Sequence, residues 1–311
     1  MNVAHLHLLL NHVPTVGSVV ALGLLLLALV RRDEGLKHAG LEVIFAIAVL
    51  TLPVYISGVA AYRELRDQPE LSEVAVLLHQ DAALAGFALT EFTGFVAWAG
   101  LWQTRRRGRA APGIVAAVVV LLTVALAVMA RAATLGGEIR HPEIRAGVSA
   151  VAAAPDADQF VAAAINTVAL NSTWVWPAAE AVHFLGLALV FGVLLAVNLR
   201  ILGVARQVAF ADVHRLLPWG MLGFGANLVT GMFFFIGQPG QYVGNSPFYW
   251  KIAFLMIAGA NFLYLTVFKR PWAADRPESG LADKAMAVAS IAAWLGVLYG
   301  GRMLPFLGRA F

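Results

Sequence analysis

Eight long apolar runs, separated by polar stretches, constrain this chain more than any other feature of its sequence. They lie near residues 9–30, 39–62, 74–102, 113–132, 177–199, 216–237, 249–268 and 285–307. A run of about 18 or more apolar residues is long enough to cross a ~30 Å hydrocarbon core as a helix. The sequence therefore predicts an all-α, polytopic integral membrane protein with about eight transmembrane helices.

The composition agrees with a chain that lies in lipid. Hydrophobic residues make up 60% of the 311 residues and charged residues only 13%, whereas a soluble domain carries roughly 25% charge. The net charge of +4 does not predict nucleic-acid binding, because the basic residues fall in short loops between apolar runs. We expect the lipid bilayer, and no nucleic acid, as a partner.

The chain contains no cysteine. This excludes disulfides, thiolate metal sites and covalent c-type haem, which requires a Cys-x-x-Cys-His motif. Any metal or haem must therefore be bound by His, Met, Lys, carboxylate or backbone ligands.

One long polar connector divides the runs into two sets of four. It predicts a first four-helix membrane bundle at residues 1–132, an outward-facing connector at 133–174 and a second four-helix membrane bundle at 175–311. Within the connector, Gly136 and Gly137 predict a turn directly after the fourth span.

The distribution of basic residues predicts the orientation. Most of the 22 Lys and Arg residues lie in loops near residues 31–37, 105–109, 200–215 and 269–284. The positive-inside rule places these loops in the cytoplasm. We therefore expect a multi-pass protein of the bacterial inner (plasma) membrane with both termini in the periplasm.

The two halves show a faint internal similarity. His12 precedes Arg31, and His183 precedes Arg200, at similar spacings on the first helix of each half. This pattern favours a parallel duplication of a four-helix bundle.

Five of the eight histidines gather at the outer end of the first half. They are His5, His7, His12, His79 and His141. In an up-down-up-down bundle the first and third spans lie diagonally, and facing imidazoles from such helices hold b-type haem or a metal in bundle cores. The sequence therefore predicts a cofactor site at this end.

The choice of axial ligands stays open in the sequence. His7 and His12 are five residues apart, about 140° around a helix, so at most one of them faces the bundle axis. The depth of the residue along its span favours His7 as the axial ligand, whereas burial within the span favours His12. His79 is the expected second ligand, with His141 and His5 as hydrogen-bonding or propionate partners. The alternatives are a copper ion bound by His12 and His79, and a structural role at the helix ends.

The second half offers one further candidate cofactor-binding residue, His183. It shares a helical face with Glu180, three residues earlier, whereas His214 lies at the opposite end of its span. The alternative is a structural His183, satisfied by Glu180, Lys251 and Asn227.

The first half resembles an uncharacterised bacterial membrane domain family. The stretch HLLLNHVP at 7–14 is similar to that family's opening His-Pro-x-x-x-His-x-Pro, with Leu8 in place of the first Pro. His79 matches the histidine that opens the family's third span, and GGEIRH at 136–141 resembles its Gly-Gly-x-x-x-x-His ending. The resemblance covers roughly residues 5–147 and implies a site formed by these histidines.

The second half is similar to another uncharacterised four-helix family, through EAVH at 180–183, NLRILG at 198–203 and TG at 230–231. Asn198 stands where that family has Asp. This half also distantly resembles copper-resistance D-type membrane proteins and membrane b-type cytochromes. The resemblances imply redox or metal chemistry at the outer histidines.

Together these observations favour a membrane b-type cytochrome-like electron-transfer subunit that carries haem b. Its expected partners are quinone, a periplasmic electron carrier or a larger membrane complex. The alternatives are a membrane carrier for copper or another small solute, and a cofactor-free scaffold subunit. No hydrolase, kinase or nucleotide-binding motif is present in the sequence.

Overall fold

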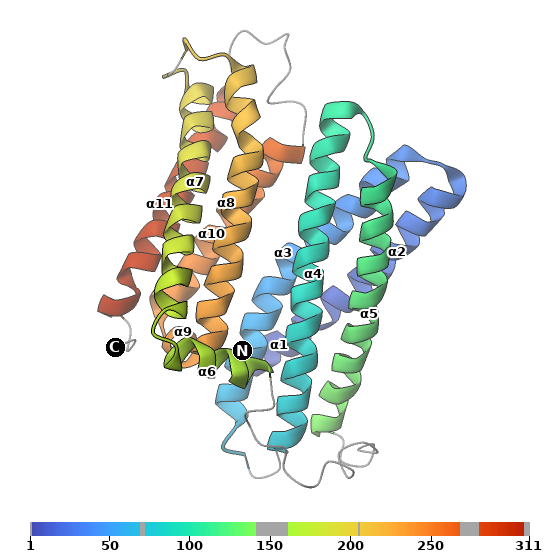
Figure 1. The fold of residues 1–311 in the computed structure, drawn as a ribbon, viewed down its shortest axis with the longest axis vertical. Helices are drawn as coiled ribbons and strands as arrows, with labels where there is room; N and C mark the ends of the chain where they lie inside the picture. The colour runs from blue at the N-terminus through green and yellow to red at the C-terminus, as the bar shows by residue number, and fades with distance from the viewer. Residues whose placement is uncertain (1, 69–71, 141–160, 205, 268–279, 308–311) are drawn as a thin grey trace. The chain divides into compact units, whose positions relative to one another are not determined.

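The computed structural model describes residues 2–68, 72–140, 161–204, 206–267 and 280–307. These residues form helices and contain no strand (Figure 1). The helices are α1 (Val3–Leu10), α2 (His12–Arg31), α3 (Glu34–Leu65), α4 (Glu73–Arg107), α5 (Pro112–Arg140), α6 (Val161–Asn171), α7 (Val175–Leu202), α8 (Phe210–Gly237), α9 (Pro239–Val243), α10 (Ser246–Val267) and α11 (Leu281–Leu307).

Eight segments are long and apolar enough to cross a bilayer, with α1 and α2 together forming the first. Large apolar side chains cover their outer faces: Val30 is 83% exposed, Leu185 71% and Val229 70%. Extensive apolar exposure is unfavourable in water but expected against lipid. The prediction of an all-α polytopic membrane protein is confirmed.

The first span is interrupted at Asn11. Pro14 lacks the N–H that would bond to the carbonyl of Leu10, and its ring crowds that carbonyl. Asn11 keeps helical dihedral angles (φ −61°, ψ −22°), and both α1 and α2 pack against α3. His7 therefore lies on the part of the first span that precedes this interruption and faces α3.

Short capping residues set the ends of several spans. The side chains of Asp33 and Ser72 accept hydrogen bonds from backbone N–H groups in the first turns of α3 and α4, at 3.0 and 3.4 Å. Gly108 and Gly203 end α4 and α7 with φ of +80° and +85°, values that favour glycine because it has no Cβ.

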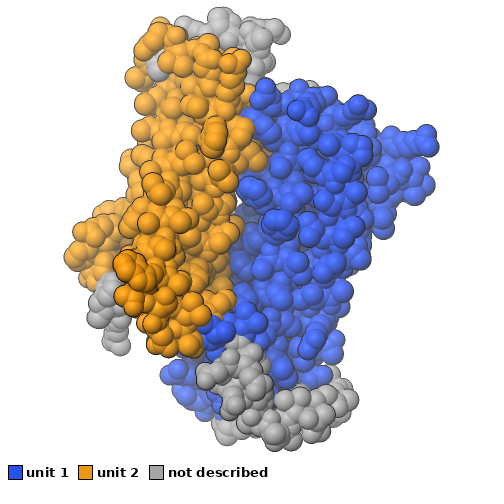
Figure 2. All heavy atoms as spheres, viewed as in Figure 1, with its two compact units in different colours: residues 1–164 blue, residues 165–311 orange. Residues whose placement is uncertain are grey.

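The chain divides into two compact units, residues 1–164 and 165–311, coloured separately in Figure 2. In unit 1 each span packs against the span that follows it, and α5 closes back on α2. The span formed by α1 and α2 therefore lies diagonally from α4. Each unit is described by itself below.

In unit 2, α7 packs against α8, α10 against α11, and α11 against α7. Glycines bring α7 and α8 together, because a Cβ on Gly223 would lie only 2.8 Å from the carbonyl oxygen of Gly186. Between α7 and α11, the buried Asn198 side chain donates from Nδ2 to Ser290 Oγ at 3.0 Å.

The predicted turn at Gly136 and Gly137 is wrong. Helix α5 continues through both glycines to Arg140. The internal hydrogen bonds of a helix are worth keeping in apolar surroundings, where a freed backbone group finds no water. The glycines therefore present a helix surface without side chains, rather than a reversal of the chain.

Candidate functional site

His7 is held by the backbone of the neighbouring helix. Its Nδ1 lies 3.2 Å from the carbonyl oxygen of Val54 and 3.2 Å from Ser57 Oγ, both on α3. Ser57 Oγ gives its own proton to the Val54 carbonyl at 2.8 Å. Because both atoms therefore act as acceptors, Nδ1 of His7 carries the hydrogen and Nε2 keeps its lone pair.

His79 repeats this arrangement in the other half of the unit 1 bundle. Its Nδ1 lies 2.8 Å from the carbonyl oxygen of Ala132 on α5. A carbonyl can only accept, so Nδ1 of His79 is the donor and Nε2 again keeps its lone pair. Neither His7 nor His79 makes a hydrogen bond through Nε2 to any of the described residues.

The two imidazoles belong to one site. His7 and His79 come from diagonal spans of unit 1 and lie within electrostatic range of each other. Both side chains are half-buried. A histidine that donates one ring N–H to a carbonyl is fixed in orientation, and its other nitrogen becomes a better ligand for a metal.

Glycines make room for both rings. A Cβ on Gly58 of α3 would lie 2.9 Å from His7 Cε1, and a Cβ on Gly136 of α5 would lie 3.1 Å from His79 Cε1. Between α3 and α4, Tyr55 stacks on Phe87 with ring centroids 4.8 Å apart. Each imidazole thus occupies the space that a side chain at Gly58 or Gly136 would take.

The other candidates in the first half lie elsewhere. His12 is the first residue of α2 and is exposed, as is His5, whose backbone N–H bonds to the Asn2 cap of α1 at 2.9 Å. Of the two candidate ligands on the first span, His7 is the half-buried one that lies within electrostatic range of His79. His141 lies outside the described residues.

His183 of unit 2 has a similar local environment. Its Nδ1 lies 2.8 Å from Thr230 Oγ1 on α8, and Thr230 passes its own proton to the Ala226 carbonyl at 2.7 Å. Nδ1 of His183 is therefore also a donor. Asn227 bonds to the backbone carbonyl of His183 at 2.7 Å rather than to its ring, and Glu180 accepts from Trp176.

Lys251 lies within electrostatic range of His183. Its half-buried side chain forms no ion pair or hydrogen bond with any residue that the structure describes. Gly300 and Gly301 of α11 lie against it: a Cβ on Gly300 would be 3.1 Å from Lys251 Cβ, and one on Gly301 3.7 Å from Nζ.

Sequence reasoning missed the residues that position the histidines. Ser57, Gly58 and Gly136 are small residues in or next to apolar runs, and only the pairing of helices shows that they face imidazoles. It also missed Glu91 of α4, whose Oε1 is buried without a hydrogen bond to any described residue. An acid near the middle of the apolar run 74–102 was the available signal.

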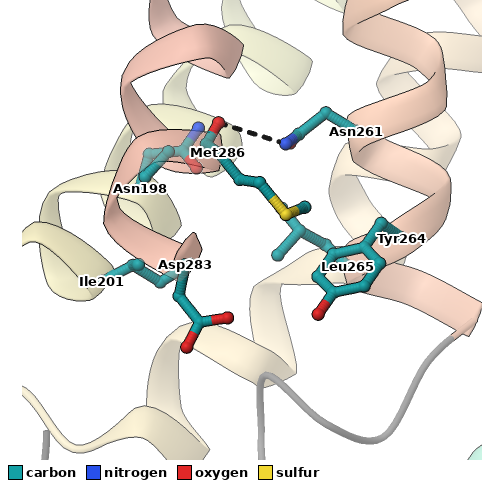
Figure 3. A pocket seen from close by; sticks show the side chains of 8 residues that line it. Asn198, Ile201, Asn261, Tyr264, Leu265, Asp283 and Met286 are labelled. Carbon is teal, nitrogen blue, oxygen red and sulfur yellow. Dashed lines mark hydrogen bonds between the residues drawn. The ribbon is translucent and has the colours of Figure 1, made fainter. Parts of the chain in front are cut away.

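A separate small pocket lies at the opposite end of unit 2 (Figure 3). Asn198 of α7, Asn261 of α10 and Asp283 of α11 line it, and Asn261 Nδ2 donates to the Met286 carbonyl at 3.2 Å. The pocket contains no histidine and is distant along the helices from His183 and Lys251. It is not part of the candidate site.

Over the described residues, no group of three or more His, Cys, Asp or Glu side chains could hold a metal ion. No protein-family model matches the chain, and neither a curated protein nor a solved structure matches it. Its function is therefore inferred from the geometry of its own residues.

Proposed function

We propose that this protein is a membrane b-type cytochrome-like electron-transfer subunit in which His7 and His79 hold a haem b. Its electrons would pass to or from quinone, a periplasmic electron carrier or a larger membrane complex. In this proposal the protein lies in a bacterial inner membrane with this end of unit 1 and both termini in the periplasm, which the positive-inside rule supports through the basic loops.

One observation carries the proposal. Two imidazoles from diagonal spans each donate Nδ1–H to the neighbouring helix, at 3.2 Å for His7 and 2.8 Å for His79, and each keeps a free Nε2 lone pair. A purely structural histidine in a membrane helix would gain by bonding through both nitrogens. Two free lone pairs within one bundle suit a metal centre with two axial ligands.

The residues fit haem better than a bare metal ion. A copper or zinc ion takes three or four protein ligands, and the described part of the chain offers no such group. A haem iron needs only two, because the porphyrin supplies four. Gly58 and Gly136 let the two imidazoles lie directly against α3 and α5, which fixes the rings as axial ligands require.

The chain's own residues have distinct tasks in this proposal. A bound haem would supply a one-electron Fe(III)/Fe(II) couple. Val54, Ser57 and Ala132 fix the tautomer and direction of the two imidazoles and increase their basicity. Tyr55 and Phe87 close the inner side and limit the access of water, which tunes the potential of a haem centre.

The test compares three histidine variants of the purified full-length protein. Reduced-minus-oxidised spectra and the haem-to-protein ratio are measured for the wild type, His7→Ala, His79→Ala and His12→Ala. We expect His7→Ala and His79→Ala each to remove one bis-imidazole haem per chain. His12→Ala, the matched control from the same span, should retain the wild-type ratio.

Two results would contradict the proposal. A wild-type protein without a b-type spectrum, prepared from haem-replete cells, would remove its basis and favour a copper carrier or a scaffold subunit. Loss of haem in His12→Ala but not in His7→Ala would show that the first span presents the other histidine.

A further inference from the structure

The two units present the same pattern at their first hairpins. In unit 1, His7 bonds to the hydroxyl of Ser57 and its ring lies against Gly58. In unit 2, His183 bonds to the hydroxyl of Thr230, and a Cβ on Gly231 would lie 3.6 Å from its Cε1. In both units, therefore, the histidine bonds to a hydroxyl side chain and lies against the glycine that follows it.

The second hairpins correspond as well. In unit 1, His79 of the third span lies against Gly136 of the fourth, which Gly137 follows. In unit 2, Lys251 of the seventh span lies against Gly300 and Gly301 of the eighth. Lys251 thus occupies the position in unit 2 that His79 occupies in unit 1.

The exchange of imidazole for ammonium changes what the pair can bind. His7 and His79 offer two lone pairs, which suit a metal. His183 offers one lone pair at Nε2, while Lys251 offers hydrogen-bond donors and a positive charge. A donor and an acceptor within electrostatic range of each other suit a ligand that has both a hydroxyl and a second oxygen.

We propose that His183 and Lys251 form a binding site for the head group of a membrane hydroquinone, with one hydroxyl donating to His183 Nε2 and the other oxygen accepting from Lys251 Nζ. An ammonium group without a counter-ion is costly at a membrane span, and Lys251 has no acidic partner among the described residues. Phe234, with its ring centroid 5.5 Å from that of His183, lies against the imidazole.

The use of this site in electron transfer rests on the proposed function. When a hydroquinone is oxidised to quinone, both O–H bonds break and two electrons leave. His183 Nε2 would take the first proton and the second would pass to water. The two electrons would leave to a one-electron acceptor, the role that a bound haem would supply in the proposed function. Binding itself requires no haem.

The experiment measures ligand-induced stabilisation of the purified full-length protein in detergent. Thermal unfolding is followed by tryptophan fluorescence under argon, with decylubiquinol or with decylbenzene, which has the alkyl chain but no oxygens. We expect saturating decylubiquinol to raise the wild-type Tm by roughly 3 °C or more, and decylbenzene to leave it unchanged. The shift should disappear in His183→Ala and Lys251→Met.

Lys251→Arg retains the positive charge and should retain most of the shift, and Lys284→Met of α11 is the matched control that should retain all of it. Equal shifts with both compounds, or an undiminished shift in His183→Ala and Lys251→Met, would overturn the inference. A wild type with its full haem content but no shift would overturn it while sparing the proposed function. A Tm shift with decylubiquinol in a protein that binds no haem would contradict only the proposed function.

Discussion

At the residue scale, a hydrogen-bond partner decides what each histidine can do. Val54 and Ala132 present carbonyl oxygens to Nδ1 of His7 and His79, at 3.2 and 2.8 Å. The partner fixes the tautomer, and the tautomer leaves the lone pair on Nε2. His12 has no such partner within the described chain and remains exposed.

Gly58 provides a test of the space beside His7. In Gly58→Ala the new methyl group would lie 2.9 Å from His7 Cε1, so the imidazole must move away from the Val54 carbonyl. Overpacking of this kind costs roughly 1–3 kcal/mol, and we expect haem affinity to fall about tenfold or more. Haem retention during dialysis against apomyoglobin measures this change.

Gly23→Ala is the control for that substitution, because a Cβ at Gly23 has nothing within 4 Å. Gly23→Ala should retain haem as the wild type does. Equal haem retention in Gly58→Ala and the wild type would show that the contact with Gly58 does not position His7.

Because of Tyr242 in α9, we expect the folded protein to lose stability at high pH. Burial, and then the negative charge of Glu180, raises the pKa of Tyr242 to about 12, whereas an unfolded tyrosine titrates near 10. The unfolded state therefore ionises first, and stability falls as pH rises from about 10 to 12. Tyr242→Phe should reduce this fall by on the order of 2 kcal/mol.

Thermal unfolding at pH 9 and pH 11.5 provides the measurement. Tyr299→Phe, which changes an exposed tyrosine, is the control and should lose stability between these pH values as the wild type does. If Tyr242→Phe loses as much stability as the wild type, Tyr242 does not stay neutral in the folded protein.

At the element scale, Pro14 leaves the Leu10 carbonyl without its helical partner between α1 and α2. In Pro14→Ala, residue 14 regains an N–H for that carbonyl, and α1 and α2 should join into one stiffer helix. We expect His7, fixed to the stiffer helix, to bond less well to the Val54 carbonyl. We expect unchanged or slightly higher helix content by circular dichroism together with a lower haem-to-protein ratio.

Pro112→Ala is the comparison for Pro14→Ala, since Pro112 is the first residue of α5 and interrupts no helix. It should keep the wild-type haem content. Full haem content in Pro14→Ala would mean that α1 reaches α3 without the proline.

The elements also show how far sequence reasoning reaches. Apolar run length predicted all eight spans, because spanning lipid demands about 20 apolar residues whatever they pack against. It did not predict that α5 passes through Gly136 and Gly137, since glycine favours turns in water but stays helical in apolar surroundings.

The same limit applies to the candidate site. Histidines of the first and third spans could be assigned to one end of the bundle from sequence alone. The choice of His7 over His12 could not, because it depends on which side chain the helix pairing brings to the Val54 carbonyl. The sequence offered Lys251 only as a structural partner of His183, and its position against Gly300 and Gly301 followed from the helix pairing.

At the scale of the whole molecule, the two units repeat one arrangement of side chains and glycines, but unit 2 has Lys251 where unit 1 has His79. Each receives a histidine of its first span against a hydroxyl-glycine pair, Ser57-Gly58 or Thr230-Gly231. Each places a basic side chain of its third span against glycines of the fourth. The duplication stays a prediction, and under the two proposals this difference separates a metal-type pair in unit 1 from a hydroquinone-type pair in unit 2.

Orientation is testable for the molecule as a whole, because a chain without cysteine gives no labelling background. Gly240→Cys, where a Cβ meets nothing within 4 Å, should react with a membrane-impermeant maleimide in intact spheroplasts. Arg109→Cys, in the basic loop between α4 and α5, should react only after permeabilisation. The reverse pattern would place His7 and His79 on the cytoplasmic side.

The central claim is that the imidazole of His79 is a ligand of iron rather than a support for α5. The measurement is the reduced spectrum of His79→Gly with and without added 1-methylimidazole, which has a lone pair for iron but no N–H for the Ala132 carbonyl. We predict that the substitution removes the low-spin bis-imidazole signal of unit 1 and that 1-methylimidazole restores it. A signal that persists in His79→Gly, or that no imidazole restores although the variant is folded and supplied with haem, would contradict the account.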